Sequence, residues 1–168
     1  TGAVALIISG EDSTAQLLGF TLTGGTGTAF RDQSDGLIYV EGGAVLIDNS
    51  NPHIHHNLII SNHAARRPQG VSSAGGGAIR AGFGGGIITH NVILENEGGG
   101  IVIFFAQTTI TNNVIAENFG GQDYGGAGLW VGGSNSTCRL TNNTIVGNVS
   151  TNQPGGGIRG FGGVISGT

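Results

Sequence analysis

Polar and apolar residues alternate with a period of two in four stretches of the chain that align on one another. These stretches occupy residues 52–62, 86–96, 108–118 and 138–148, and a weaker copy occupies residues 15–25. Such alternation places successive side chains on opposite faces of a strand, so each copy is predicted to be extended. Two aliphatic columns are predicted to face inward: Ile54, Ile88, Ile110 and Leu140, and then Ile59, Ile93, Ile115 and Ile145. Self-similarity of this kind predicts a solenoid in which each copy belongs to one coil.

Asparagines recur at two positions of the repeat. One set lies between the aliphatic columns, and a second set, Asn62, Asn96, Asn118 and Asn148, ends each copy. Asparagine tolerates the left-handed backbone conformation of a bend, and stacked amides can hydrogen-bond along the axis. We therefore predict that Asn57, Asn91, Asn113 and Asn143 lie at the bend between two strands of their coils and stack from coil to coil as a structural ladder. Phe20 takes this position in the weaker copy and is predicted to end the ladder.

A glycine cluster followed by an apolar run precedes each copy. The clearest cases are Gly42 to Ile47, Gly75 to Arg80, Gly98 to Phe104 and Gly155 to Arg159. Glycine adopts positive φ without strain, so each cluster is predicted to form a sharp corner that leads into a further strand. Each coil is thus predicted to contain three strands, which we number one to three in chain order.

The combination of a GGGI corner with a following PxIxxNxIxxN or TITNNVIAEN repeat resembles the right-handed parallel β-helix proteins that are similar to pectate lyases. The resemblance covers nearly the whole chain from Val4 onward. It implies an all-β, right-handed parallel β-helix with three sheets and about five to six coils. We expect a single domain over residues 1–168.

Composition narrows the function classes. Glycine accounts for 35 of the 168 residues and only 10% are charged, which suits corners and aliphatic ladders better than helices. The chain has no lysine and a net charge of -4, which argues against nucleic acid as a partner. Its apolar runs are too short to span a membrane. It contains no methionine and no signal-peptide pattern, so we expect a processed or excised piece of a larger protein.

The resemblance also implies where a substrate would bind. In the β-helix enzymes of this kind, the cleft is formed by the outward face of strand one and by loops after strand three. The outward residues here are predicted to include Arg80, Trp130 and Arg159, and an exposed tryptophan between arginines could stack on a sugar and bind carboxylates. The alternative is that Trp130 packs under the loop at 119–126. The candidate carbohydrate-binding set is Arg80, Trp130, Arg159, Asp123, Tyr124, Arg66 and Arg67.

Candidate chemistry is otherwise sparse. His53, His55, His56 and His90 are predicted to lie close together and could hold zinc or copper, but no carboxylate or cysteine completes the set, so solvated histidines are the alternative we favour. The paired-aspartate, GHG and RIK motifs of polygalacturonase-like members are absent. We expect no catalytic residue and no cofactor. The lone Cys138 cannot form an intramolecular disulfide and is predicted to fill a half-buried space.

Strand three carries a feature that suggests assembly. Its outward positions are mostly aliphatic, in one column of Leu58, Val92, Val114 and Thr144 and another of Ile60, Leu94, Ala116 and Val146. A continuous exposed apolar stripe usually marks an interface. The alternative is that the asparagine bend resets the alternation and turns one column inward. No polar or helical cap is evident at either end, which predicts a longer solenoid or head-to-tail filaments.

Together these patterns predict a non-catalytic structural or assembly module, extracellular or on the cell surface, whose main partner is itself. The alternative is a polysaccharide-binding or polysaccharide-cleaving module that uses the strand-one face. A third reading, an ice-binding surface formed by Thr89, Thr111 and Thr141, is weakened because His55 and Leu18 interrupt that column.

Overall fold

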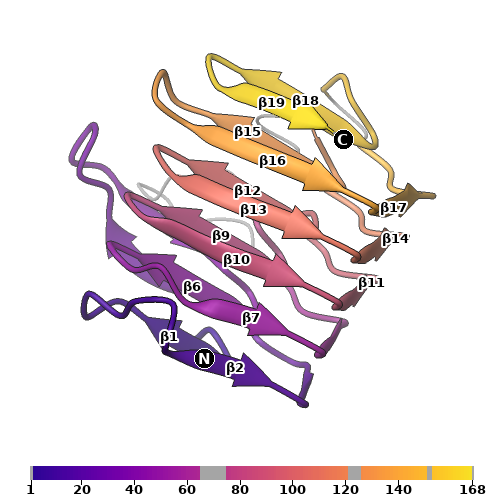
Figure 1. The fold of residues 1–168 in the computed structure, drawn as a ribbon, viewed down its shortest axis with the longest axis horizontal. Helices are drawn as coiled ribbons and strands as arrows, with labels where there is room; N and C mark the ends of the chain where they lie inside the picture. Colours follow the sequence, from indigo (N-terminus) through magenta and orange to yellow (C-terminus); the bar gives the residue numbers. More distant parts are fainter. Residues whose placement is uncertain (1, 65–74, 121–125, 151–152, 168) are drawn as a thin grey trace.

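The computed structural model describes residues 2–64, 75–120, 126–150 and 153–167. The chain winds through three parallel sheets, one strand per sheet in each coil, and the coils stack in sequence order from the N-terminal to the C-terminal end (Figure 1). The predicted parallel β-helix is confirmed, and the described residues form no helix.

Strand one of successive coils forms sheet A, strand two forms sheet B and strand three forms sheet C. Sheet A contains β1 (Ala5–Ile7), β6 (Val45–Asp48), β9 (Ile79–Gly82), β12 (Ile101–Phe104), β15 (Leu129–Gly132) and β18 (Ile158–Phe161). Sheet B contains β2 (Gln16–Leu18), β7 (His53–His55), β10 (Gly85–Thr89), β13 (Gln107–Thr111), β16 (Thr137–Thr141) and β19 (Val164–Gly167). Sheet C contains β3 (Thr21–Leu22), β8 (Leu58–Ile60), β11 (Val92–Leu94), β14 (Val114–Ala116) and β17 (Thr144–Val146).

The core is a stack of like residues. In sheet B, Ile54 pairs with Ile88, Ile88 with Ile110, and Ile110 with Leu140. In sheet C, Ile93 lies between Ile59 and Ile115. The isoleucines of these columns in the central coils are fully buried. Every predicted inward column is therefore confirmed, and each coil buries its aliphatic side chains against the next.

The predicted asparagine ladder is confirmed in full. The backbone N–H and Nδ2 of Asn91 both donate to Oδ1 of Asn113, at 2.9 and 3.0 Å. Nδ2 of Asn91 also donates to the carbonyl of Ile54 in the preceding coil, at 2.9 Å. Asn62, Asn96, Asn118 and Asn148 form a second ladder with the same pattern. At the first coil the backbone N–H of Phe20 donates to Oδ1 of Asn57 at 3.0 Å, so Phe20 ends the ladder as predicted.

The left-handed position of the bend differs from the prediction. It is the residue before each ladder asparagine that has positive φ, for example 54° at His56 and 55° at His90. The same holds at the second bend, where Glu95 and Glu117 have φ values of 52° and 54°. The expectation that the ladder asparagine itself takes this conformation is wrong. The preceding residue makes the turn, and the asparagine occupies its position because its side chain forms hydrogen bonds along the axis.

Residues 26–41, between strand three of the first coil and strand one of the second, form an antiparallel hairpin. Its strands are β4 (Thr28–Arg31) and β5 (Ile38–Glu41), with Phe30 paired to Tyr39. The hairpin lies outside the coils and brings its aromatic and acidic residues to sheet A.

Cys138 lies inside the coil on β16 and is 1% exposed, so it is more deeply buried than the half-buried position we predicted. Burial raises the pKa of its thiol to about 12. Because the thiolate is the reactive form, we expect native protein to resist maleimide labelling at mildly alkaline pH and to react once urea unfolds it. Mass spectrometry of the labelled protein measures this, and full labelling of the folded chain would contradict the buried position.

Candidate functional site

The outward face of sheet A is the first candidate site. Alternation along each strand places Leu46, Arg80, Val102 and Trp130 on this face, in one column across four adjacent strands. Their exposed fractions are 1%, 0%, 6% and 4%. The predicted outward column is correct, but the expectation that Trp130 is exposed is wrong. This part of the strand-one face is covered by the protein itself.

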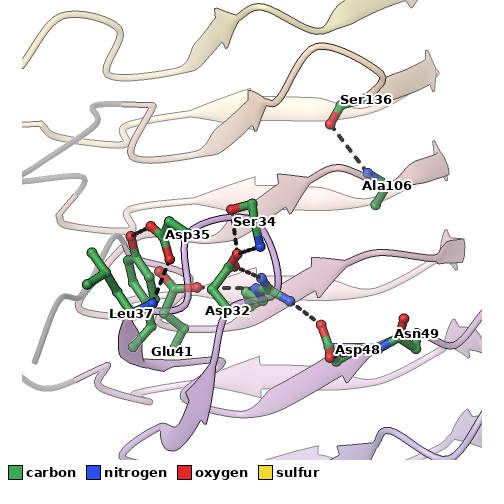
Figure 2. Close-up of polar contacts among 11 residues, drawn as sticks. Asp32, Ser34, Asp35, Leu37, Glu41, Asp48, Asn49, Ala106 and Ser136 are labelled. Atoms are coloured by element: carbon green, nitrogen blue, oxygen red, sulfur yellow. Dashed lines mark hydrogen bonds and ion pairs between the residues drawn. The ribbon is translucent and has the colours of Figure 1, made fainter.

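Arg80 on β9 is the centre of a buried charge cluster. Its Nη2 lies 2.9 Å from Oδ2 of Asp32, its Nε lies 3.2 Å from Oε2 of Glu41, and its Nη1 lies 2.8 Å from Oδ1 of Asp48. Asp32 follows β4, Glu41 ends β5 and Asp48 ends β6, and Figure 2 shows the three carboxylates turned toward a common centre. Charged groups are retained in an interior when each has partners of opposite sign, as here.

Aromatic rings complete the enclosure of the guanidinium. The Cζ atom of Arg80 lies 4.4 Å from the ring centroid of Phe30 on β4 and 6.0 Å from that of Phe83. A guanidinium over an aromatic face gains cation–π attraction. Three residues of the hairpin, Phe30, Asp32 and Glu41, thus contact the side chain of Arg80. Arg80 thereby holds the hairpin against sheet A.

The cluster gives these acidic residues a structural role. The sequence alone does not identify Glu41 and Asp48 as a general acid and base pair, and the structure brings them together with Asp32 around Arg80. They surround a cation and hold a hairpin, which leaves no open space between them for a substrate. The sequence analysis did not identify Asp32 as a site residue. The available signal was that Asp32 lies in an insertion between coils, while Arg80 is predicted to face outward on a later coil.

Trp130 packs within the same face. Its ring centroid lies 5.7 Å from that of Phe104, and a Cβ atom at Gly132 would lie 2.0 Å from its ring. Gly132 is therefore the residue that lets the indole lie against the strand. Trp130 is a packing residue here, as our alternative interpretation expected, although most of the loop proposed to cover it lies outside the described residues.

Of the remaining members of the predicted carbohydrate-binding set, only Arg159 lies among the described residues. Arg159 on β18 is half-buried, and its Nη1 lies 3.3 Å from Oε1 of Gln153. Arg66, Arg67, Asp123 and Tyr124 lie outside the described residues. A carbohydrate site formed by these residues stays a prediction.

The four histidines come together as predicted, but through stacking and polar contacts. The rings of His56 and His90 are parallel with centroids 4.9 Å apart, and His53 and His55 have centroids 4.0 Å apart. Burial lowers the pKa of His53, and the neighbouring imidazoles lower it further. Nε2 of His53 is 2.8 Å from Oγ1 of Thr89. Within the part of the chain that the structure describes, no group of three histidine, cysteine or acidic side chains is arranged to hold a metal ion.

A groove of about 500 Å³ crosses the outward face of sheet B. Its lining includes amide and hydroxyl side chains and one arginine, among them Asn51, Gln107, Thr109, Thr137, Arg139 and Ser166. No carboxylate lines it among the described residues. These groups can hydrogen-bond a polar ligand, but they supply no acid and base pair for hydrolysis.

The outward face of sheet C is aliphatic and open to solvent. Leu58, Val92 and Val114 are 36%, 36% and 37% exposed, and the second column is partly exposed at Ile60 and Leu94. The intervening isoleucines are the inward ones, so the alternative in which the bend turns one column inward is wrong. Both aliphatic columns lie on the outward side of the sheet, and only Ala116, at 5% exposed, is buried there among the aliphatic members of the second column.

Comparisons with known proteins support the fold. A family model described as a right handed beta helix region matches residues 7–164, which runs from β1 to β19. Neither the curated proteins nor the solved structures compared with the chain give a match. Within the described ranges, no helix has the length and apolar character needed to cross a membrane.

Proposed function

Because the chain belongs to the right-handed β-helix family, we propose that it is a non-catalytic structural solenoid that assembles with further copies of itself. The observation that carries this proposal is the aliphatic outward face of sheet C, which continues from coil to coil through Leu58, Val92 and Val114. A face of this kind costs free energy when it stays in contact with water, and association removes that cost.

Among the described residues, the outward faces of sheets A and B offer no free acid and base pair, which supports the non-catalytic part of the proposal. On sheet A, Asp32, Glu41 and Asp48 are bound to Arg80. On sheet B, the polar groups that line the groove among the described residues are amides, hydroxyls, the thiol of Cys138 and Arg139, with no carboxylate. Glycoside hydrolysis requires two carboxyl groups that flank the bond to be broken, and neither face offers them among the described residues.

We propose end-to-end stacking of solenoids as a further mode of assembly, because an unpaired strand edge readily accepts another strand. We propose that assembly takes place outside the cell or on its surface, which fractionation of the producing cells would test.

Sedimentation velocity across a wide range of concentrations tests this function, together with electron microscopy of the concentrated protein. We expect the sedimentation coefficient to rise with concentration, and filaments or paired particles to appear in the images. A strictly monomeric profile at every concentration, with no ordered assemblies in the images, would contradict the proposal.

Polysaccharide binding is the second candidate function, and the groove on sheet B favours it over the strand-one face. A long groove rich in amides and hydroxyls suits a chain of sugar hydroxyl groups, while Arg139 suits a carboxylate on that chain. Retention on immobilised acidic polysaccharide that is lost in Arg139→Ala would support this candidate, and release of unsaturated or reducing sugars would show cleavage.

A further inference from the structure

The outward face of sheet C is bordered by two edges of different chemistry. The edge before each strand, which we call the leading edge, consists of His56, His90, Asn112 and Asn142. The edge after each strand, the trailing edge, consists of Ser61, Glu95, Glu117 and Gly147. Residues of both edges have positive φ, so they occupy the corners of the coil on either side of the aliphatic columns.

The trailing edge places like charges next to each other. Leu94 pairs with Ala116 in adjacent strands, so Glu95 and Glu117 follow in neighbouring coils about 4.8 Å apart along the axis. Both are exposed, and neither carboxylate makes a hydrogen bond or ion pair within the described residues. Neighbouring like charges on a sheet are destabilising, and a donor or cation placed against them would relieve the repulsion.

The leading edge offers such groups at the same level of the solenoid. His56 and His90 stack in adjacent coils, and Nδ2 of Asn112 lies 3.0 Å from Nε2 of His90. Imidazole and amide N–H groups are donors to carboxylates, and a protonated imidazole also attracts them by charge.

Resting on the proposed assembly function, we infer that sheet C binds a second copy of this chain about a two-fold axis parallel to the solenoid axis. This rotation keeps every coil at its own level and reverses the strand direction, so each leading edge meets the partner's trailing edge. His90 then faces the partner's Glu95, and Asn112 faces the partner's Glu117. Because the contact is isologous, each pairing occurs twice.

The aliphatic columns fit the same rotation. The column that begins with Leu58 meets the partner's column that begins with Ile60, so Val92 faces the partner's Leu94, and Val114 faces the partner's Ala116. Large side chains thus lie opposite large ones at one end of the face, and smaller ones lie opposite each other toward the other end. A two-fold axis along the strands would instead place trailing edge against trailing edge and bring the two acidic edges together.

The size of the face sets the strength of the contact. Five strands about 4.8 Å apart, with about five residues each from edge to edge, give roughly 400 Å² per copy. Standard stable interfaces bury about 800 Å² per partner. The pairing is therefore weak and reversible, and it fits a module that gains strength by repetition in an assembly.

Cross-linking tests the orientation. Asn112→Cys and Glu117→Cys are prepared as separate variants. Each variant alone, and an equal mixture of the two, is treated with a bismaleimide whose span is shorter than the distance between the leading and trailing edges. The buried native Cys138 stays unlabelled, so dimers report the new cysteines. We expect cross-linked dimers in the mixture and none with either variant alone. Dimers from one variant alone would overturn the axis, and no dimers in the mixture would overturn the pairing.

Sedimentation equilibrium tests the face itself. Val92→Asp buries a carboxylate in the contact and should weaken association at least about tenfold. Thr109→Asp, at an outward position of sheet B in a central coil, is the matched control and should leave association unchanged. Equal effects of the two variants would overturn the sheet C contact. Filaments that persist without lateral cross-links would overturn this inference while leaving the proposed function intact, whereas a monomer at every concentration would overturn both.

Discussion

Replacement of Arg80 by alanine is expected to destabilise the protein by about 3–5 kcal/mol, because removal of one partner leaves buried charges without compensation. Arg80 is 0% exposed and Asp32 is 3% exposed, so water cannot replace the lost guanidinium without opening the structure. The hairpin β4–β5 should separate from sheet A, since its ion pairs and the Phe30 contact depend on Arg80. Urea unfolding measures the stability, and limited proteolysis between residues 31 and 38 reports the hairpin.

Arg159→Ala is the matched control for Arg80→Ala. Arg159 lies in the same outward column, pairs with Trp130 in the sheet, and is half-buried. Its removal should cost about 1 kcal/mol or less, because solvent screens a partly exposed charge. If Arg80→Ala were as stable and as resistant to proteolysis as Arg159→Ala, the charge cluster would not be what holds the hairpin.

Replacement of Asn91 by alanine is expected to cost more than about 3 kcal/mol, because each buried polar group left without a partner costs about 1–3 kcal/mol. Oδ1 of Asn91 accepts from the backbone N–H and from Nδ2 of Asn57, at 3.0 and 3.1 Å. Its Nδ2 donates to the carbonyls of Ile54 and Thr89, at 2.9 and 3.0 Å. Nδ2 also donates to Oδ1 of Asn113 in the following coil, at 3.0 Å, so the substitution breaks hydrogen bonds to the coils on both sides at once.

Asn112→Gly provides the comparison for the ladder. Asn112 is exposed, lies at a bend with φ of 56°, and its side chain contacts His90. Glycine keeps the left-handed backbone without strain, so this change should be nearly neutral. The urea midpoints of both variants measure the difference. A loss in Asn91→Ala no larger than that in Asn112→Gly would show that the ladder adds little to stability.

The fold could be predicted from the sequence because the same pattern of inward and outward residues recurs in successive coils. Each inward position is specified several times, as Ile54, Ile88 and Ile110 illustrate, so alternation and alignment together determine the strands and their register. The bend was predicted less well. Alignment shows that Asn57 recurs, but it does not reveal whether its backbone or its side chain is the reason, and His56 proved to take the left-handed conformation.

The sequence correctly predicted which way the side chains of the candidate site point, but not whether they are exposed to solvent. Alternation correctly placed Arg80 and Trp130 outward on sheet A, yet outward does not mean exposed when an insertion folds back over the face. The partners of Arg80 lie 48 residues away at Asp32 and 39 residues away at Glu41. No repeat or local pattern specifies contacts between an insertion and a coil, because they occur once in the chain.

The asparagine ladder separates distance along the chain from distance in space. Successive rungs are 34, 22 and 30 residues apart in sequence, yet each is joined to the next by a hydrogen bond of 3.0–3.1 Å. A coil can therefore gain or lose residues outside the three strands while its neighbours keep their spacing. Variation in such a protein is free to accumulate at the perimeter, around an axis that repeats without change.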